Sequence, residues 1–223
     1  MTEGIDTPDS RGRTGLDRTG LDLTGNPRVK VREVKLLSSH WYVERATTFD
    51  YRHADGTWHT EERETHDRGN GATLLLYDAE RETVLLTRQF RFPAYVNGHP
   101  DGMLIETPAG LLDAEDEHPE HAVRREVVEE TGHTVGDVQH VFDVYMSPGS
   151  VTERISFYAA AYTPSTRTHE GGGLDEEGED IEILELPFQR ALEMIRTGEI
   201  ADAKTIMLLQ WAALRGPFAP ERR

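Results

Sequence analysis

Three glutamates lie close together near the middle of the chain, in the stretch REVVEETG. Glu126, Glu129 and Glu130 stand three and four positions apart. In a helix, which turns by about 100° per residue, their side chains fall within one arc of about 100°. Val123 and Val127 border that arc, so the carboxylates adjoin the stripe that packs on the core. Clustered, partly buried anions are unfavourable unless a cation compensates them.

A divalent cation is the compensation that this cluster favours. Arg124 and Arg125 adjoin the glutamates. They can compensate only part of the negative charge, because there are two of them and their positions on the helix are fixed. Oxygen ligands without cysteine select a hard ion, Mg²⁺ or alternatively Mn²⁺. The competing interpretation is an ordinary surface helix carrying Arg–Glu pairs. These eight residues alone leave both interpretations open.

Composition narrows the class of protein. The chain has 223 residues, no cysteine and a formal net charge of −17 at pH 7. The length suits one large domain, or a core domain with a small appendage. The lack of cysteine excludes disulfides and thiolate chemistry and is typical of a reducing cytoplasm. The negative charge disfavours nucleic acid and anionic membranes as partners.

Hydropathy gives no sign of membrane insertion. No apolar run approaches the roughly 20 residues of a spanning helix, and the N-terminus lacks the apolar segment of a signal peptide. We therefore expect a soluble cytoplasmic protein with no membrane partner. Residues 1–27 repeat TGLD and LTG, contain few apolar side chains and are predicted to be a disordered tail.

Residues 28–67 are predicted to form an antiparallel β meander. The patterns favour strands at 29–39, 41–53 and 57–67, with a hairpin turn at HADG, residues 53–56. Three strands bury little surface alone. We expect the meander to pack on the main domain or on a second subunit.

Residues 68–217 are predicted to form the main domain, an α/β (α+β) fold with a mixed β-sheet sandwiched between helices. The patterns favour a hairpin, a strand ending in a Pro-Ala-Gly turn, three more strands and two C-terminal helices, at 71–92, 102–110, 138–149, 154–164, 181–187, 188–198 and 203–214. The acidic helix has Asp116 or Glu117 as a candidate cap, Pro119 in its first turn and Gly132 at its end.

The longer stretch PAGLLDAEDEHPEHAVRREVVEETG resembles the signature of the Nudix hydrolase family. The match consists of the loop glycine Gly110, Arg125-Glu126, an aliphatic residue, Glu129-Glu130 and the closing Gly132. Two departures are present. The segment after Gly110 is one residue longer than usual, so either Asp116 or Glu117 fills the isolated acidic position. His133 stands where an aliphatic residue is usual.

The resemblance extends over roughly residues 30–215, through LTRQFRF, YMSPGSVTERISFY and ALEMIRTGEIADAKTIMLL. These segments resemble the GDP-mannose pyrophosphatase branch of the family, which is close to the ADP-ribose pyrophosphatases. The branch implies Mg²⁺-dependent cleavage of a nucleotide-sugar pyrophosphate into a nucleoside monophosphate and a sugar 1-phosphate. GDP-mannose is the first expected substrate, and ADP-ribose or another ADP-sugar the second.

The resemblance also implies metal and catalytic residues. The expected ligands are the backbone carbonyl of Ala109, with Glu126, Glu130 and one glutamate of the late acidic loop STRTHEGGGLDEEGED. Alignment on the following EDIE makes this last ligand Glu179, but the loop is two residues longer than in the relative, so Glu177 remains an alternative. The expected catalytic residues are Glu130, Glu153 and Glu177, and the general base is either of the last two. By composition alone, the late loop would be a solvated acidic segment.

The residues that the branch places against the substrate come from several segments. They are Trp41, Arg63, Glu64, Arg91, Ala109, Gly110, Leu111, Glu130, Glu153 and Lys204. Glu62 stands where the relative has a cation. For Trp41 the alternative is packing beneath the meander, and for Arg91 an ordinary surface arginine. The branch further implies a homodimer through residues 29–66, in which the meander completes the partner's pocket.

Two other classes compete with the enzyme. A Nudix-fold sensor would bind a nucleotide sugar without cutting it, but such proteins usually lack members of the glutamate cluster, which is complete here. An acidic interaction module would leave the Pro-Ala-Gly segment and the late acidic loop unexplained. The sequence leaves open the sugar, the base, the pathway and the role of the tail.

Overall fold

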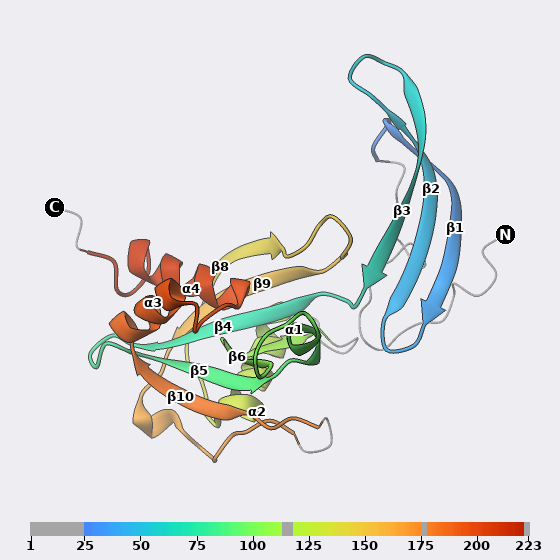
Figure 1. Cartoon of the computed structure of the whole chain (residues 1–223). Helices are drawn as coiled ribbons and strands as arrows, with labels where there is room; N and C mark the ends of the chain where they lie inside the picture. The colour runs from blue at the N-terminus through green and yellow to red at the C-terminus, as the bar shows by residue number, and fades with distance from the viewer. Residues whose placement is uncertain (1–24, 113–117, 175–177, 221–223) are drawn as a thin grey trace. The chain divides into compact units, whose positions relative to one another are not determined.

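The computed structural model describes residues 25–112, 118–174 and 178–220 (Figure 1). They divide into two compact units. The first holds the described residues of Met1–Gly71, Leu111–Glu117 and Val144–Ile155, and the second those of Ala72–Gly110, His118–Asp143 and Ser156–Arg223. Most of the predicted tail lies outside the described residues.

The first unit contains the predicted antiparallel meander. Its strands are β1 (Val29–Ser39), β2 (Val43–Arg52) and β3 (Trp58–Asp67), in the order β1-β2-β3. The turn between β2 and β3 falls at HADG, where Gly56 has φ +87°, a backbone conformation that favours glycine. The amide of Gly56 donates to the carbonyl of His53. The predicted strands and turn are confirmed.

A buried ion pair fixes the end of β3. Arg45 on β2 donates from Nη1 to Asp67 at 3.0 Å, and both side chains are almost fully buried. Thr152 also donates to Asp67, at 3.0 Å, and His66 pairs with Val151. The end of β3 therefore holds the segment that carries Glu153.

The second sheet has seven strands. Its order is β10-β5-β4-β9-β8, with β6 paired to β5 and β7 paired to β4. The strands are β4 (Gly71–Asp78), β5 (Thr83–Phe90), β6 (Met103–Glu106), β7 (Ala109–Leu111), β8 (Val138–Tyr145), β9 (Arg154–Ala161) and β10 (Glu182–Pro187). The sequence predicts a Pro-Ala-Gly turn at the end of the strand that corresponds to β6. That prediction was wrong in part, because Ala109 and Gly110 begin β7 and pair with β4.

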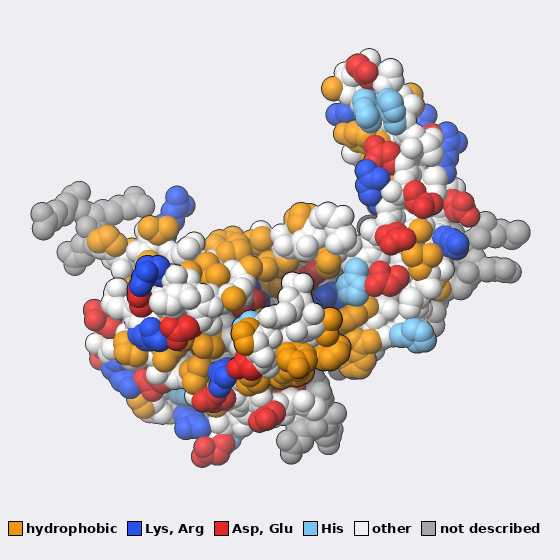
Figure 2. All heavy atoms as spheres, viewed as in Figure 1, with side chains coloured by type: hydrophobic (Ala, Val, Ile, Leu, Met, Phe, Trp, Pro, Cys, Tyr) orange, Lys and Arg blue, Asp and Glu red, His pale blue; other side chains and the backbone are white. Residues whose placement is uncertain are grey.

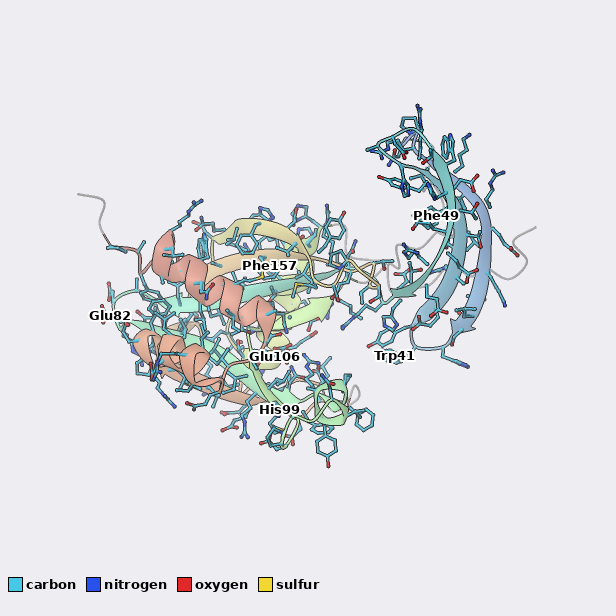
Figure 3. The ribbon with its side chains drawn as sticks, turned by 45° about the horizontal axis from the view of Figure 1, so that its top comes forward. Trp41, Phe49, Glu82, His99, Glu106 and Phe157 are labelled. Carbon is cyan, nitrogen blue, oxygen red and sulfur yellow. The ribbon has the colours of Figure 1, made fainter. Side chains whose placement is uncertain are left out.

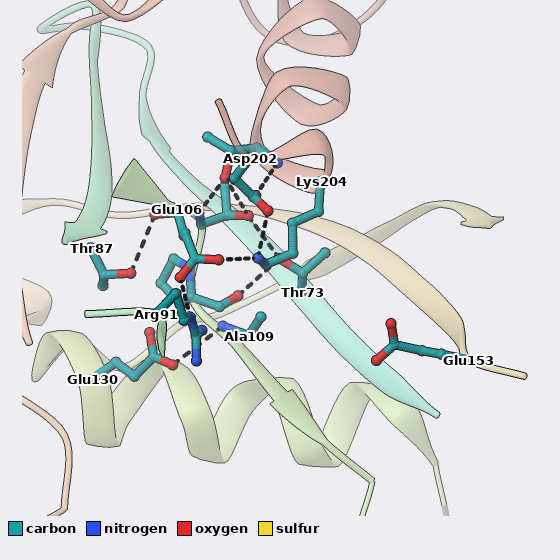
Figure 4. A network of polar contacts seen from close by, with 12 residues as sticks. Thr73, Thr87, Arg91, Glu106, Ala109, Glu130, Glu153, Asp202 and Lys204 are labelled. Carbon is teal, nitrogen blue, oxygen red and sulfur yellow. Dashed lines mark hydrogen bonds and ion pairs between the residues drawn. The ribbon is translucent and has the colours of Figure 1, made fainter. Parts of the chain in front are cut away.

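The helices are α1 (Phe92–Val96), α2 (Pro119–Thr131), α3 (Phe188–Thr197) and α4 (Ala203–Leu214), with a 3₁₀ turn η1 (Pro164–Thr166). Helices α3 and α4 contact each other, and α2 contacts β5. The close view in Figure 4 has α4 on one side of the strands and α2 on the other. This confirms the predicted α+β architecture. No helix within the described part of the chain is long and apolar enough to cross a membrane.

The core of the second unit lies between this sheet and its helices. Its fully buried side chains come mainly from β4, β5, β9, α2 and α4, and they include Leu74, Leu75, Leu76, Val84, Leu86, Val123, Val127, Phe157, Leu208 and Leu209. Each such side chain contributes roughly 1.5–3 kcal/mol by burial. Phe157 is labelled within the sheet in Figure 3. This core holds helix α2 against β5.

Helix α2 begins one residue later than the predicted caps allow. Its N-cap is His118, whose Nδ1 accepts from the amide of Glu120 at 3.2 Å. The prediction of Asp116 or Glu117 as the cap was wrong, because with Pro119 as the first helical residue the cap must directly precede it. Asp116 and Glu117 themselves lie outside the described residues. The predicted roles of Pro119 and of Gly132, at φ +73°, are confirmed.

The visible surface mixes both signs of charge. In Figure 2, Lys and Arg side chains lie among Asp and Glu side chains on both units. Exposed pairs such as Arg190 with Glu199 and Arg196 with Glu193 account for part of this mixture. Exposed pairs of this kind contribute about 0–1 kcal/mol each, so they serve solubility more than stability.

Candidate functional site

Helix α2 carries one glutamate into the protein interior. Glu130 is only 1% exposed. It shares the buried stripe of the helix with Val123 and Val127, as the helical spacing requires. Glu126 lies one turn earlier, on a partly exposed flank. The predicted placement of the carboxylates beside the core is thus confirmed.

The alternative of Arg–Glu pairs describes only part of this helix. Arg124 pairs with Glu120 at 2.8 Å. Arg125 lies 3.1 Å from a carboxylate oxygen of Glu126 and from one of Glu129. Among the described residues, no ion pair reaches Glu130. The most deeply buried carboxylate of the cluster is therefore the one for which the described residues supply no ion-pair partner.

The carboxylate of Glu130 is incompletely satisfied. Its Oε1 accepts from the amide of Ala109 at 3.4 Å. Its Oε2 is buried and has no hydrogen-bond partner among the described residues. Burial, with the charges of Glu126 and Glu179, raises the pKa of Glu130 well above its usual value. A bare carboxylate oxygen in such a place is costly unless a cation meets it.

The backbone at Gly110 closes over the neighbouring glutamate. A Cβ at this position would lie 1.9 Å from Oε1 of Glu126. Only a residue without a side chain allows this approach. The segment containing Ala109 and Gly110 therefore lies against Glu126 and Glu130 of α2, so that the first and last parts of the matched signature meet.

The late acidic loop is anchored on the end of α2. The amide of Gly172 donates to the carbonyl of Glu130 at 2.9 Å, and that of Gly173 to the carbonyl of Glu129 at 3.1 Å. These bonds satisfy carbonyls that the end of a helix leaves unpaired. Further along, Glu179 accepts from the amide of Leu174 at 3.0 Å. Glu177 lies outside the described residues, so the alternatives for the loop ligand stay open.

His133, the departure from the usual aliphatic residue, is part of the fold around this anchor. Its ring packs edge-on against Tyr162, with centroids 5.4 Å apart, and its Nδ1 lies 3.0 Å from the hydroxyl of Thr166. Burial, with the charge of Arg167, lowers the pKa of His133. A neutral ring in a buried position replaces the aliphatic side chain without adding a charge.

The contact between α2 and the late loop depends on Gly132. A Cβ there would lie 2.1 Å from the carbonyl oxygen of His169, in addition to the strain of its positive φ. We expect Gly132→Ala to lower the free energy of unfolding by about 3 kcal/mol. Gly198→Ala is the matched control, because Gly198 has φ +83° but open space around it. The control should lose only about 1–2 kcal/mol. Chemical denaturation measures both, and equal losses would contradict the role of the contact.

Arg91 and Lys204, both predicted to bind substrate, meet at one buried carboxylate (Figure 4). Arg91 donates from Nε to Glu106 at 2.7 Å, and Lys204 donates from Nζ to Glu106 at 2.5 Å and to Asp202 at 2.9 Å. Arg91 is thus more than an ordinary surface arginine. Burial lowers the pKa of Lys204, but Glu106 and Asp202 outweigh it and raise that pKa above its usual value.

The sequence reasoning missed Glu106 and Asp202. Glu106 lies just before the Pro-Ala-Gly segment, and Asp202 is the N-cap of α4, accepting from the amide of Thr205. The sequence could have indicated Asp202 as the N-cap of the last helix, because an aspartate just before a helical pattern is a typical cap. For Glu106 the only signal was a charge directly after the apolar residues Met103–Ile105 of the predicted strand.

The other predicted residues belong to the first unit. Trp41 is 68% exposed, so the alternative of packing beneath the meander was wrong (Figure 3). Arg63 is exposed and pairs with Glu61, and Glu64 lies opposite Ala46 on β2. Leu111 ends β7.

Glu153 differs from the solvated glutamate that its turn position would favour. It is 8% exposed and pairs with Arg68 at 3.2 Å. Arg68 in turn lies over the ring of Tyr42, 5.6 Å from its centroid. The carboxylate is therefore held in place within the first unit.

The oxygen atoms of the site are of a kind that can bind a divalent cation. Among the described residues, no three Asp, Glu or His side chains already converge at metal-binding spacing. The candidate ligand atoms are nevertheless hard oxygens, and one of them, Oε2 of Glu130, is buried without a hydrogen-bond partner among the described residues. Gly110 packs so closely on Glu126 that no side chain fits between them. Oxygen donors of this kind fit Mg²⁺ or Mn²⁺.

Two family models match this chain. A family model described as "NUDIX domain" matches residues 67–209. A model described as "GDP-mannose pyrophosphatase NudK N-terminal domain" matches residues 28–66.

Curated relatives match most of the chain. The chain is 53% identical over 191 residues to a GDP-mannose pyrophosphatase of Pectobacterium atrosepticum, covering 86% of this chain and 97% of the relative. It is 48% identical over 192 residues to a GDP-mannose pyrophosphatase of an Enterobacter species, covering 86% and 98%. Among solved structures, the crystal structure of an ADP compounds hydrolase matches with a TM-score of 0.64 and 16% identity, over 85% of this chain and 97% of that one. This last similarity supports the fold alone.

Proposed function

The chain belongs to the NUDIX family, and from this premise we propose that it hydrolyses the pyrophosphate bond of a nucleotide sugar with bound Mg²⁺. GDP-mannose is the proposed first substrate, with ADP-ribose or another ADP-sugar second. The products are a nucleoside monophosphate and a sugar 1-phosphate. The observation that carries the proposal is the buried oxygen of Glu130, without a hydrogen-bond partner among the described residues.

The ligands proposed for the ion include that oxygen. Glu126 and Glu130 from α2, the carbonyl of Ala109 and Glu179 from the late loop would hold it, with Glu177 as the alternative loop ligand. When bound, the ion supplies concentrated positive charge that stabilises the phosphate oxygens in the transition state. The amide of Ala109 already donates to Glu130, which orients this carboxylate.

The remaining roles are proposed for other side chains. Arg91 and Lys204 donate to the phosphates, as their geometry around Glu106 allows. A carboxylate accepts the proton of the attacking water. The two candidates for this general base are Glu153, held by Arg68, and Glu177. The variants Glu153→Gln and Glu177→Gln are compared, and the one with the larger loss of kcat identifies the base.

We also propose that residues 29–66 form a homodimer interface. The three-stranded sheet exposes large apolar side chains at Val31, Leu37, Trp41 and Trp58, which supports burial against a second copy. In such a dimer, Trp41, Arg63 and Glu64 would contribute to the partner's pocket. The lack of cysteine in the sequence supports the cytoplasm as the compartment.

The dimer is tested by sedimentation. The full chain should sediment at twice its own mass, and Trp41→Glu should shift it toward the monomer, because a buried charge at the interface is unfavourable. Glu193→Gln on α3, outside residues 29–66, is the control. A wild-type monomer at all concentrations would contradict the interface.

The enzyme is tested on a panel of nucleotide sugars. Purified chain with Mg²⁺ is given GDP-mannose, ADP-ribose, other nucleotide sugars and dinucleotides, and phosphorus NMR follows the products. GDP-mannose should give the highest kcat/KM. Tight binding without cleavage of any compound would instead identify the non-catalytic sensor, against which the complete glutamate cluster argues.

A further inference from the structure

A single buried carboxylate joins the two cations of the site. Glu106 is 3% exposed. One of its oxygens accepts from Arg91 and the other from Lys204, at 2.7 and 2.5 Å. Charge-assisted bonds of this length are the strong ones. Glu106 thus fixes the distance between the guanidinium and the ammonium.

The geometry leaves the remaining donors of both cations available. Arg91 uses Nε for Glu106, and its two Nη atoms have no partner among the described residues. Lys204 uses two of its three ammonium hydrogens, for Glu106 and Asp202. With Glu106 in place, the free donors have one orientation, instead of the many that long, flexible side chains would sample.

The backbone around Glu106 is itself fixed. Thr87 donates to the carbonyl of Glu106 at 3.3 Å. The next amide, that of Thr107, donates to the hydroxyl of Thr205 on α4 at 2.7 Å, and Thr73 lies 2.8 Å from the hydroxyl of Thr107. Three residues after Glu106, Ala109 donates to Glu130. One short segment therefore connects the two cations with the glutamates of α2.

Glu106 places one carboxylate between the two cations. Asp202 pairs with Lys204 alone, so Glu106 is the only described carboxylate within ion-pair distance of Arg91. Without Glu106, Arg91 would lose its described ion-pair partner and Lys204 would keep only Asp202. The two like charges would then repel each other.

We propose that Glu106 is a positioning residue, which aligns Arg91 and Lys204 to bind the pyrophosphate group of the substrate. This inference rests on the proposed function. Glu106 does not itself touch the substrate in this scheme; it acts through the two cations. Ordered donors lower the entropic cost of binding a phosphate.

The test is a double-mutant cycle on the full chain. Glu106→Gln keeps the size of the side chain, but it presents an NH₂ group to one of the cations. Its kcat/KM should fall about 10- to 100-fold, mostly through KM. In an Arg91→Met background the same change should cost about threefold or less, because its partner is already gone. The proposal would be overturned if Glu106→Gln lowered kcat/KM by the same factor in the wild type and in Arg91→Met. It would also be overturned if a folded Glu106→Gln kept the wild-type kcat/KM.

Two further measurements keep the test decisive. Glu193→Gln, which breaks an exposed pair with Arg196 on α3, is the control and should leave kcat/KM unchanged. Thermal melts show whether each variant is folded. If Glu106→Gln does not fold, Glu106→Asp replaces it in the cycle, since it keeps the charge but shortens the reach.

Binding of inorganic pyrophosphate separates this inference from the proposed function. Calorimetry with Mg²⁺ should show affinity about tenfold weaker in Glu106→Gln than in the wild type. If the wild type cleaves no compound of the panel but this difference is present, the proposed function fails and the role of Glu106 stands. Equal affinities, or a wild type that neither binds pyrophosphate nor cleaves the panel, overturn the role of Glu106.

Discussion

Replacing Glu130 with glutamine is expected to lower kcat about 1,000-fold or more, because it removes a charged ligand of the proposed metal ion. A bound divalent ion is worth several kcal/mol of transition-state stabilisation, and each 1.4 kcal/mol is about a factor of ten in rate. The measurement is steady-state kinetics with saturating GDP-mannose and Mg²⁺. A Glu130→Gln enzyme within tenfold of the wild-type kcat would contradict the assignment.

The same variant should lose activity but no stability when metal is absent. Without metal, Glu130→Gln should be at least as stable as the wild type, because an amide in this buried place replaces a carboxylate whose Oε2 is unsatisfied. Added Mg²⁺ should stabilise the wild type, by about 2.7 kcal/mol at 100 times its Kd, and the variant much less. Glu120→Gln, in the first turn of the same helix and paired with Arg124, is the matched control. It should keep both the activity and the response to Mg²⁺.

Replacing Gly110 with alanine is expected to lower kcat/KM about 10- to 100-fold, through a change of metal affinity. The added Cβ would lie 1.9 Å from Oε1 and 2.1 Å from Cδ of Glu126. Because Glu126 is a flexible side chain, it can swing away, so the fold should survive while the ligand is lost. The measurements are kcat/KM as a function of Mg²⁺ concentration and a thermal melt.

The control for Gly110→Ala is Gly136→Ala. Gly136 has open space around it and no positive φ, so its substitution should change neither activity nor metal dependence. A Gly110→Ala enzyme with the wild-type Mg²⁺ dependence would show that Glu126 does not need its observed orientation. Loss of folding in this variant, by contrast, would mean that the backbone moves instead of the side chain.

Local patterns predicted most of the secondary structure. The strands β1, β2 and β3, the hairpin turn at HADG and the helices α2, α3 and α4 all follow from periodicity and turn residues. Helix α1 was not predicted, because its five residues bury no side chain and so carry no helical periodicity. The strand β7 was missed for a related reason, since three residues show no alternation and only pairing with β4 defines them.

The glutamate cluster and the family of this protein were determined by the sequence alone. The spacing of Glu126, Glu129 and Glu130 is a local property of one helix, and local geometry can be read from consecutive residues. The tertiary structure decided which of them is buried, that Gly110 closes over Glu126, and that Glu106 holds Lys204 across 98 positions of the chain. A contact of this kind depends on how β6 and α4 pack against each other. It cannot be read from consecutive residues, because the two side chains are far apart in the sequence.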